Sequence, residues 1–259
     1  MNILIISLLN AKERRDFQQN QLSKLDLEFE FLDATSTNDI NTETYKKHDH
    51  DWQRPLKKTE VACYYSHKSA WNKIIKTNQP ALILEDDALL SKCLPDLLTC
   101  LFSRKNIDLI NLENNRRKKN VSKFSETIVC NSKLLRLYQD RAGAAGYILW
   151  PSGATKLIQC ERQKGIALAD AHITECNNLI TYQVEPSPII QLECCDYYKV
   201  SNSINKSVAV SGVSSHNNPK GGIYFRLRRV YAQIKLGIYQ LTLIIKSERR
   251  HIIIRRKDF

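Results

Sequence analysis

Three consecutive acidic residues are the part of this sequence best suited to chemistry. They follow a short apolar run in the segment A-L-I-L-E-D-D-A, where Glu85, Asp86 and Asp87 end what we expect to be a buried strand. Carboxylates at such a position are costly unless water, hydrogen bonds or a cation stabilise them. Mg²⁺ and Mn²⁺ prefer oxygen ligands of this kind and complete their shells with phosphate oxygens. The acidic triplet (Glu85, Asp86 and Asp87) therefore predicts either a divalent metal site or a solvated turn.

Short apolar runs alternate with amphipathic stretches on both sides of this triplet. We expect strands at residues 2–8, 29–32, 81–84, 107–112 and 143–150, and helices at residues 12–25, 59–76 and 94–102 and from Pro151 onward. Thr59 is a candidate N-cap. The polar segments at residues 35–54 and 116–123 are expected to be loops. Strands that alternate with helices predict an α/β fold, in which helices cover both faces of a sheet.

The acids have a defined place relative to this sheet. Ligands of α/β proteins bind beyond the carboxyl ends of the strands. Ser7, Asp33 and the acidic triplet each stand at the end of an expected strand. We therefore expect them along one edge of the sheet.

Several segments occur in a characteristic order and spacing. They read I-I-S-L followed by E-R-R at 13–15, F-E-F-L-D-A at 29–34, T-E-V-A-C-Y-Y-S-H-K-S-A-W at 59–71, A-L-I-L-E-D-D-A at 81–88, A-G-A-A-G-Y-I-L at 142–149 and I-A-L-A-D at 166–170. This ordered set resembles glycosyltransferase family 25, and the resemblance covers residues 2–200. A minor departure is Ala88, where the family pattern often has Val or Ile.

The resemblance implies a glycosyltransferase A-type, Rossmann-like fold. It also implies an inverting reaction with a UDP-sugar donor and Mn²⁺ or Mg²⁺, which neutralises the diphosphate leaving group. Family members include lipooligosaccharide galactosyltransferases of Gram-negative bacteria. We therefore expect a bacterial hexosyltransferase, a β-galactosyltransferase, that moves galactose from UDP-galactose onto a lipooligosaccharide or lipopolysaccharide acceptor. UDP-glucose is the alternative donor, because the contacts that distinguish the two hexoses cannot be located in the sequence.

The resemblance also implies roles for individual residues around the nucleotide. Ser7 and either Arg14 or Arg15 would lie near the nucleotide, and Asp33 would face the uracil or the ribose. The helix that borders the donor pocket would contribute Glu60, Ser66 and His67. Small residues at 143–146 would let the sugars approach the backbone, although close strand packing explains them equally well.

The metal ligands follow from the same resemblance. Asp87 would be the direct ligand, with Asp86 as a second one. Glu85 would bind the sugar, the ribose or a metal-bound water, and these are also the alternative roles for Asp86. His216 stands in the polar segment S-S-H-N-N and would be an additional ligand. A single histidine in a loop can equally be exposed to solvent without a ligand.

Inversion requires a base that takes the proton from the acceptor hydroxyl as it attacks the donor sugar. Asp170 is the candidate, because it is the one acid in the apolar stretch I-A-L-A-D-A. The alternative interpretation is that Asp170 is a helix N-cap. His172 and Glu175 are further candidates for the base.

The C-terminal part of the chain differs from the rest. The last 40 residues hold eleven Lys and Arg and two acids, so nine of the twelve net positive charges lie there. Apolar residues recur at spacings of three and four from Ile223 to Ile245, which predicts a helix. We divide the chain into a catalytic domain at residues 1–215 and a basic helical segment at residues 216–259.

A cationic amphipathic helix can lie in a membrane interface with its basic side chains on anionic headgroups. The alternative is a helix packed on the domain with its basic face in water. The first interpretation predicts a cytoplasmic protein that associates with the inner face of the cytoplasmic membrane. No apolar stretch is long enough for a membrane span. The eight scattered cysteines predict unpaired thiols and no zinc site.

The main rival is a protein that binds nucleic acid. It would use the net charge of +12 and the basic run at residues 116–119 to contact phosphates. It leaves the acidic triplet unexplained, and no nucleic-acid-binding motif is visible. We therefore expect a UDP-hexose, a lipooligosaccharide and a membrane surface as partners, and no nucleic acid. The sequence does not predict the oligomeric state.

Overall fold

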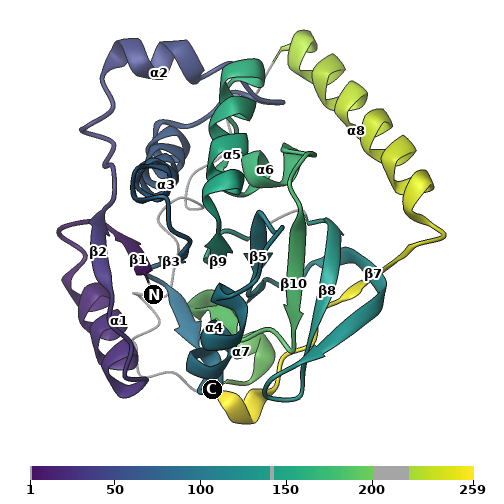
Figure 1. Cartoon of the computed structure of the whole chain (residues 1–259). Helices are drawn as coiled ribbons and strands as arrows, with labels where there is room; N and C mark the ends of the chain where they lie inside the picture. The colour runs from purple at the N-terminus through teal and green to yellow at the C-terminus, as the bar shows by residue number, and fades with distance from the viewer. Residues whose placement is uncertain (1, 141–142, 201–221) are drawn as a thin grey trace.

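The computed structural model describes residues 2–140, 143–200 and 222–259. Within these residues it contains a nine-stranded mixed sheet and a separate three-stranded sheet, and helices pack on both faces of the larger sheet (Figure 1). This architecture confirms the α/β fold class expected from the sequence.

The two sheets are built from the following strands. In spatial order the large sheet contains β12 (Ser247–His251), β7 (Lys118–Ile128), β8 (Ser132–Gln139), β10 (Thr181–Glu185), β5 (Leu109–Asn111), β9 (Gly146–Leu149), β3 (Ala81–Glu85), β1 (Asn2–Ser7) and β2 (Glu30–Asp33). The small sheet contains β4 (Ala88–Leu90), β11 (Ile189–Gln191) and β6 (Glu113–Asn114).

Strand β1 organises the half of the large sheet that carries the acidic triplet. It pairs in parallel with both β2 and β3, and β3 pairs antiparallel with β9. Leu4 and Ile6 point to one face of the sheet, and Ile3 and Ile5 point to the other. The strand is buried on both faces, which explains its uninterrupted apolar sequence.

Two layers of helices cover these faces (Figure 1). Helices α3 (Lys58–Thr77), α5 (Pro151–Lys164) and α6 (Ala169–Glu175) pack over Leu4 and Ile6, whereas α1 (Lys12–Lys24) and α4 (Leu94–Phe102) pack over Ile3 and Ile5. The shorter helices are α2 (Thr42–His48), η1 (Leu192–Cys194), α7 (Cys195–Tyr198) and η2 (Arg256–Asp258).

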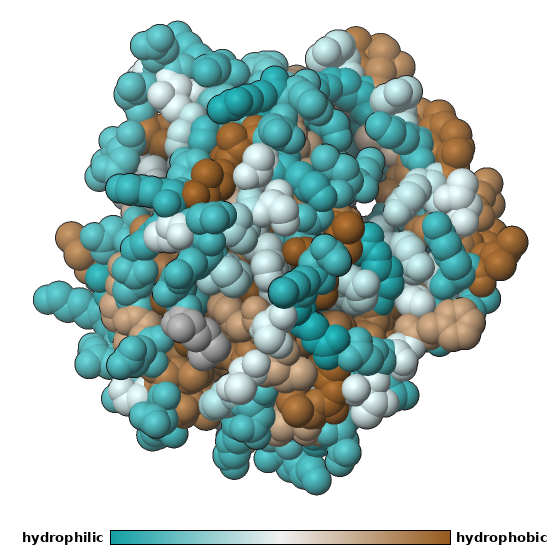
Figure 2. All heavy atoms as spheres, in the orientation of Figure 1, coloured by the Kyte–Doolittle hydropathy of each residue, from teal (hydrophilic) through white to brown (hydrophobic). Residues whose placement is uncertain are grey.

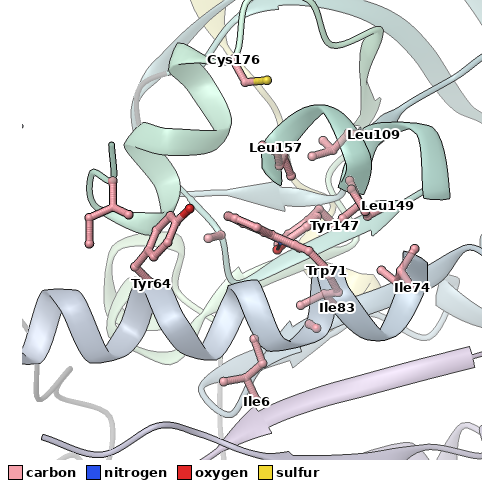
Figure 3. Close-up of a cluster of buried hydrophobic side chains, with 14 of the residues drawn as sticks. Ile6, Tyr64, Trp71, Ile74, Ile83, Leu109, Tyr147, Leu149, Leu157 and Cys176 are labelled. Atoms are coloured by element: carbon pink, nitrogen blue, oxygen red, sulfur yellow. Dashed lines mark hydrogen bonds between the residues drawn. The ribbon is translucent and has the colours of Figure 1, made fainter. Parts of the chain in front are cut away.

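Helix α3 supplies much of the core on the face of the sheet that carries Leu4 and Ile6. Its buried side includes Val61, Tyr64, Ala70, Trp71 and Ile74, at the helical spacing expected from the sequence. Figure 3 shows Trp71 reaching from α3 toward Tyr147 of β9. The helix begins one residue before the proposed cap Thr59, and Lys57 occupies the N-cap position instead.

Two segments expected to be loops are partly regular. Residues 42–48, within the polar stretch 35–54, form α2, whose N-cap Asn41 accepts a hydrogen bond from the Thr44 backbone. Residues 118–128 form the long strand β7, so the expectation of a basic surface loop at residues 116–123 was wrong from Lys118 onward. Lys119 is fully buried there and pairs with Asp140 at 2.6 Å, which removes it from any phosphate-binding surface.

The helix expected from Ile223 to Ile245 is confirmed, but the rest of the basic C-terminal segment is not all helical. Helix α8 spans Ile223–Leu243, but the chain then returns to the large sheet as β12, which pairs antiparallel with β7. Residues 247–251 are therefore part of the same sheet as the rest of the domain. They form the edge strand of that sheet and pair with β7. Strand β7 was not expected, because its sequence is polar.

Two further expectations concern membrane spans and cysteines. Among residues 2–140, 143–200 and 222–259, no helix has the length and apolar character needed to cross a bilayer. All eight cysteines lie in the described part of the chain, and none of them forms a disulfide. Four are buried and four are partly buried, in agreement with the unpaired thiols expected from the sequence.

Candidate active site

The carboxyl ends of β1, β2 and β3 bring the expected acids together. Ser7 is in register with Asp33, and Ile6 is in register with Glu85. Because the three strands are parallel, their ends meet at one edge of the sheet. The placement expected for Ser7, Asp33 and the acidic triplet is therefore correct.

Asp86 is the anchor of the acidic triplet. Its two carboxylate oxygens accept hydrogen bonds from Ser7 Oγ at 2.8 Å and from Arg14 Nη1 at 2.7 Å. The buried amide of Gln18, one helical turn after Arg14, donates to the backbone oxygens of Asp86 and Ala88 at 3.0 and 2.8 Å. Helix α1 thus holds both the side chain and the backbone of the turn that follows β3.

Arg15 connects the ends of β1 and β2. Its Nη2 atom lies 2.5 Å from Asp33 Oδ1 and 2.9 Å from the backbone oxygen of Ser7. The guanidinium also lies over the Phe31 ring, 4.8 Å from its centroid. The Asp33 side chain is 65% exposed, so it can still accept a hydrogen bond from a ligand at this edge.

Asp87 differs from its neighbours because its carboxyl has little to stabilise it. The residue is buried, and Oδ1 contacts no hydrogen-bond donor within the described residues. Burial, together with the nearby charge of Glu85, raises the pKa of Asp87 to about 8, although Arg14 opposes the shift. A buried carboxyl beside two other acids, with an oxygen left over, suits a divalent cation.

Glu85 is held by a chain of hydrogen bonds that begins in the core. Trp71 Nε1 lies 2.9 Å from the Tyr147 hydroxyl, which lies 2.9 Å from His67 Nδ1, and His67 Nε2 lies 3.1 Å from Glu85 Oε1. The indole can only donate, so the Tyr147 hydroxyl hydrogen is available for His67 Nδ1. The imidazole proton then lies on Nε2 and points to Glu85.

Glu60 and Ser66, also on α3, fix loops around the site. Glu60 is buried and accepts two hydrogen bonds from the Arg54 guanidinium, at 2.8 and 2.6 Å, and one from the Lys57 backbone. Ser66 Oγ accepts from the Thr35 backbone at 2.9 Å, just beyond β2. These bonds give both residues a clear structural role.

Asp170 lies in the first turn of α6 and is mostly buried. The N-cap of this helix is Leu168, so the alternative interpretation of Asp170 as the cap was wrong, although its Oδ1 accepts from the Ala171 backbone at 2.7 Å. Burial raises the pKa of Asp170, and the charges of Glu85 and Asp140 raise it further. Of the acidic triplet, Glu85 is thus the residue whose charge acts on the Asp170 carboxyl.

The two other candidates for the base have partners elsewhere. His172 is buried, stacks on Trp71 and lies 3.0 Å from the Leu157 backbone oxygen, and burial lowers its pKa. Glu175 accepts hydrogen bonds from Trp52 and Gln53. His216, the candidate additional metal ligand, lies outside the described residues.

Glu113 is a second buried acid near this site, and no motif in the sequence singled it out. Its Oε2 accepts from the Ala145 backbone at 2.9 Å, while Oε1 contacts no donor within the described residues. Burial raises the pKa of Glu113 to about 8. Gly143 has a φ of +109°, and a Cβ there would meet Glu113 Oε2 at 2.5 Å, so this glycine allows the close approach.

Tyr147 and Gln18 were also missed as site residues. Tyr147 lies in the quoted segment A-G-A-A-G-Y-I-L, but its contact with His67 joins residues 80 positions apart. Gln18 follows Arg14 by four residues, which places both on one face of α1. That spacing was the available signal for Gln18. Gly146, by contrast, packs closely on Ile189, as expected for strand packing.

Comparison with known proteins also points to glycosyltransferases. The family model described as "Glycosyltransferase family 25 (LPS biosynthesis protein)" matches residues 1–173. A Haemophilus influenzae protein described as a glycosyltransferase is 29% identical over 170 residues, which are 64% of this chain and 59% of that protein. This chain therefore spans less than two thirds of that relative.

Two further relatives carry more specific descriptions. The lipooligosaccharide biosynthesis protein lic2B of Haemophilus influenzae is 28% identical over 204 residues, which are 72% of this chain and 74% of the relative. Human procollagen galactosyltransferase 2 is 28% identical over 170 residues, which are 60% of this chain and 27% of the human protein.

Proposed function

The chain belongs to glycosyltransferase family 25, and from this premise we propose that it transfers a hexose from a UDP-sugar to a lipooligosaccharide or lipopolysaccharide acceptor. The proposed reaction depends on a divalent metal and inverts the anomeric carbon. The relatives support the acceptor class, since lic2B is described as a lipooligosaccharide biosynthesis protein.

The observation that carries this proposal is the state of the Asp87 carboxyl. It is buried with one oxygen lacking a donor among the described residues, and its pKa is raised to about 8. A carboxylate in this state is costly alone, and Mn²⁺ or Mg²⁺ would supply the missing partner. We assign Asp87 as the metal ligand, with Asp86 as a second, because each oxygen of Asp86 keeps a lone pair beyond its present bond.

The remaining residues of the edge would bind the donor. When bound, the metal would neutralise the diphosphate as the glycosidic bond breaks. Arg14 and Arg15 add two cationic groups at the same edge, and Asp33 remains exposed for the ribose or the uracil. Glu85, oriented by His67, would accept hydrogen bonds from the hexose.

Asp170 would act as the general base. Its raised pKa makes it a better proton acceptor than an ordinary aspartate. A general base is most efficient when its pKa lies near the pH at which the enzyme works. The acceptor hydroxyl would lose its proton to the Asp170 carboxylate as its oxygen forms the new glycosidic bond. The UDP leaving group departs from the opposite face of the sugar.

Galactose is the proposed hexose. Its support comes from the similarity to human procollagen galactosyltransferase 2. UDP-glucose remains the alternative donor. Because the two sugars differ at one hydroxyl, a binding comparison decides between them directly.

The test is calorimetric titration of the purified protein with UDP-galactose, UDP-glucose and UDP, first with Mn²⁺ and then with EDTA. The expected result is binding of one UDP-hexose that disappears with EDTA and in the Asp87→Asn variant. Binding that ignores EDTA would refute the metal assignment. Binding of none of these ligands under either condition would refute the proposed activity.

Helix α8 supports a place for this reaction at a membrane surface. Its side toward the domain includes Phe225, Arg228, Leu236 and Leu243, and Arg228 donates to the His50 and Asp51 backbone oxygens. The opposite side carries an apolar stripe, which is Ile223, Tyr224, Leu227, Val230, Tyr231, Ile234, Ile238 and Leu241. Figure 2 shows apolar side chains along the outer edge of the molecule over α8.

Charge indicates what would cover this stripe. Arg226 and Lys235 border it on its two sides at the helical repeat, and the C-terminal part of the chain is strongly basic. Apolar side chains between basic ones match a lipid surface with anionic headgroups. We assign the stripe to the inner face of the cytoplasmic membrane, where a lipid-linked acceptor would also lie.

A further inference from the structure

Three potential metal ligands of different chemistry lie beside the proposed donor pocket. Cys63 and His67 stand four residues apart on α3, so both side chains project from the same face. A ligand atom from each of Cys63, His67 and Glu85 lies within 4.8 Å of the other two. The cluster joins a helix to the end of β3.

The spacing within the cluster is close to that of a metal-bound set. His67 Nε2 and Glu85 Oε1 are 3.1 Å apart. Two ligands at about 2.0–2.1 Å from a tetrahedral zinc ion are separated by about 3.3 Å. Bringing the pair to this distance needs only a small adjustment, and Cys63 would supply the third corner.

The environment of the cluster favours a cation. Burial raises the pKa of the Cys63 thiol, and the charges of Glu85, Asp170 and Asp87 raise it further. An ion at this position would lie among these negative charges and would compensate for them. Binding would release the thiol proton, since a thiol coordinates a metal as the thiolate.

The second ring nitrogen of His67 already has the partner that a metal-bound imidazole needs. Its Nδ1 lies 2.9 Å from the Tyr147 hydroxyl. The imidazole proton would move from Nε2 to Nδ1, and the Tyr147 oxygen could accept from His67 and Trp71 through its two lone pairs. Such partners orient metal-bound histidines and strengthen binding.

We propose that Cys63, His67 and Glu85 form a second metal site, which binds a borderline-soft divalent ion such as Zn²⁺ and thereby inhibits the enzyme. A thiolate, an imidazole and a carboxylate are the ligands of zinc, whereas the carboxylates of the triplet suit Mn²⁺ or Mg²⁺. An ion at this site would hold Glu85 away from the donor hexose. The metal site stands on its own geometry, and its inhibitory effect rests on the proposed function.

Binding is tested by titrating Co²⁺ into the full-length protein with excess Mg²⁺ present to occupy the oxygen site. A thiolate–cobalt charge-transfer band is expected in the wild type, and Zn²⁺ should abolish it. The Cys63→Ser variant should lack the band. Cys100→Ser is the matched control, because Cys100 is a partly buried thiol on α4 outside the cluster and should leave the band unchanged.

Inhibition is tested by measuring transfer at fixed Mn²⁺ with increasing Zn²⁺. Zn²⁺ should raise the donor KM of the wild type. The Cys63→Ser variant should need at least about tenfold more Zn²⁺ for the same rise in KM. A band that persists in Cys63→Ser, or none in the wild type, overturns the site. A normal band in a protein without transferase activity would refute the proposed function and leave the metal site intact.

Discussion

The Tyr147 hydroxyl of β9 lies 2.9 Å from His67 Nδ1 on α3, so a tyrosine in the sheet sets the proton position of a histidine at the site. The same hydroxyl accepts from Trp71, and His67 passes the interaction on to Glu85. A core aromatic cluster thus reaches a carboxylate that we assign to the donor sugar.

This relationship predicts the effect of Tyr147→Phe. The change leaves the buried Trp71 N–H and His67 Nδ1 without a partner, which costs about 1–3 kcal/mol per group. Denaturant unfolding should therefore show a loss of about 2–6 kcal/mol for the two groups together, and the donor KM should rise because Glu85 is less well oriented. Trp71→Phe removes one donor but keeps the Tyr147–His67 bond. A Trp71→Phe variant whose KM rises as much as that of Tyr147→Phe would contradict the role of the hydroxyl.

Asp87→Asn should separate catalysis from stability. Loss of the proposed metal ligand should reduce turnover at saturating Mn²⁺ by about 10²-fold or more. The wild-type pKa of about 8 lies above the value in the unfolded chain, so the metal-free wild type loses stability as the pH rises through about 8. Asp87→Asn cannot ionise there and should melt higher than the wild type at pH 9 without metal. Thermal melts at pH 6 and pH 9, compared with kinetics, test both parts.

The affinity for Mn²⁺ should depend on pH. A carboxyl with a pKa of about 8 must lose its proton before it binds a cation, so affinity should fall about tenfold for each pH unit below 8. Titration calorimetry in buffers of different ionisation enthalpy would detect the released proton. Glu113 has a similarly raised pKa, so Glu113→Gln is the control and should keep the dependence. If the affinity of Glu113→Gln for Mn²⁺ no longer depended on pH, the titrating group would be Glu113 and not Asp87.

Asp170→Asn should slow transfer by about 10²- to 10⁴-fold, the range for removal of a general base. The variant retains the size of the side chain and should leave the Kd for the UDP-sugar unchanged, because Asp170 is assigned to the acceptor. Single-turnover kinetics with calorimetry of donor binding would measure both. Rapid transfer by this variant would remove Asp170 as the base.

The apolar stripe on α8 should determine membrane binding. Leu227→Glu places a charge where a leucine would enter the lipid, and the loss of one such side chain weakens binding by about 1.5–3 kcal/mol. Flotation with vesicles of anionic lipid should therefore show at least a tenfold loss, while turnover on a water-soluble acceptor stays unchanged. Tyr197→Glu changes a similarly exposed side chain on α7, outside the stripe, and this control variant should bind normally. Equal binding by Leu227→Glu and the wild type would mean that the stripe has another partner.

Much of the fold could be predicted from local pattern. The apolar strands β1 and β3 and the amphipathic helix α3 were placed within one or two residues, because burial on one or both faces leaves a regular spacing. The same rule failed for β7, which is polar along most of its length, and for β12, which is strongly basic. These strands form through backbone pairing with each other and with β8, which a local pattern does not reveal.

The sequence by itself determined the family, the acidic triplet and the edge of the sheet at which it would lie. These follow from motif order and from strand direction, which are properties of the chain. Only the tertiary structure decided that Asp86 is held by Ser7 and Arg14 while an oxygen of Asp87 is left without a donor among the described residues. It also brought Glu113, Tyr147 and Cys63 toward the triplet. A side chain's hydrogen bonds and its pKa depend on neighbours that folding brings from distant positions, so no local pattern encodes them.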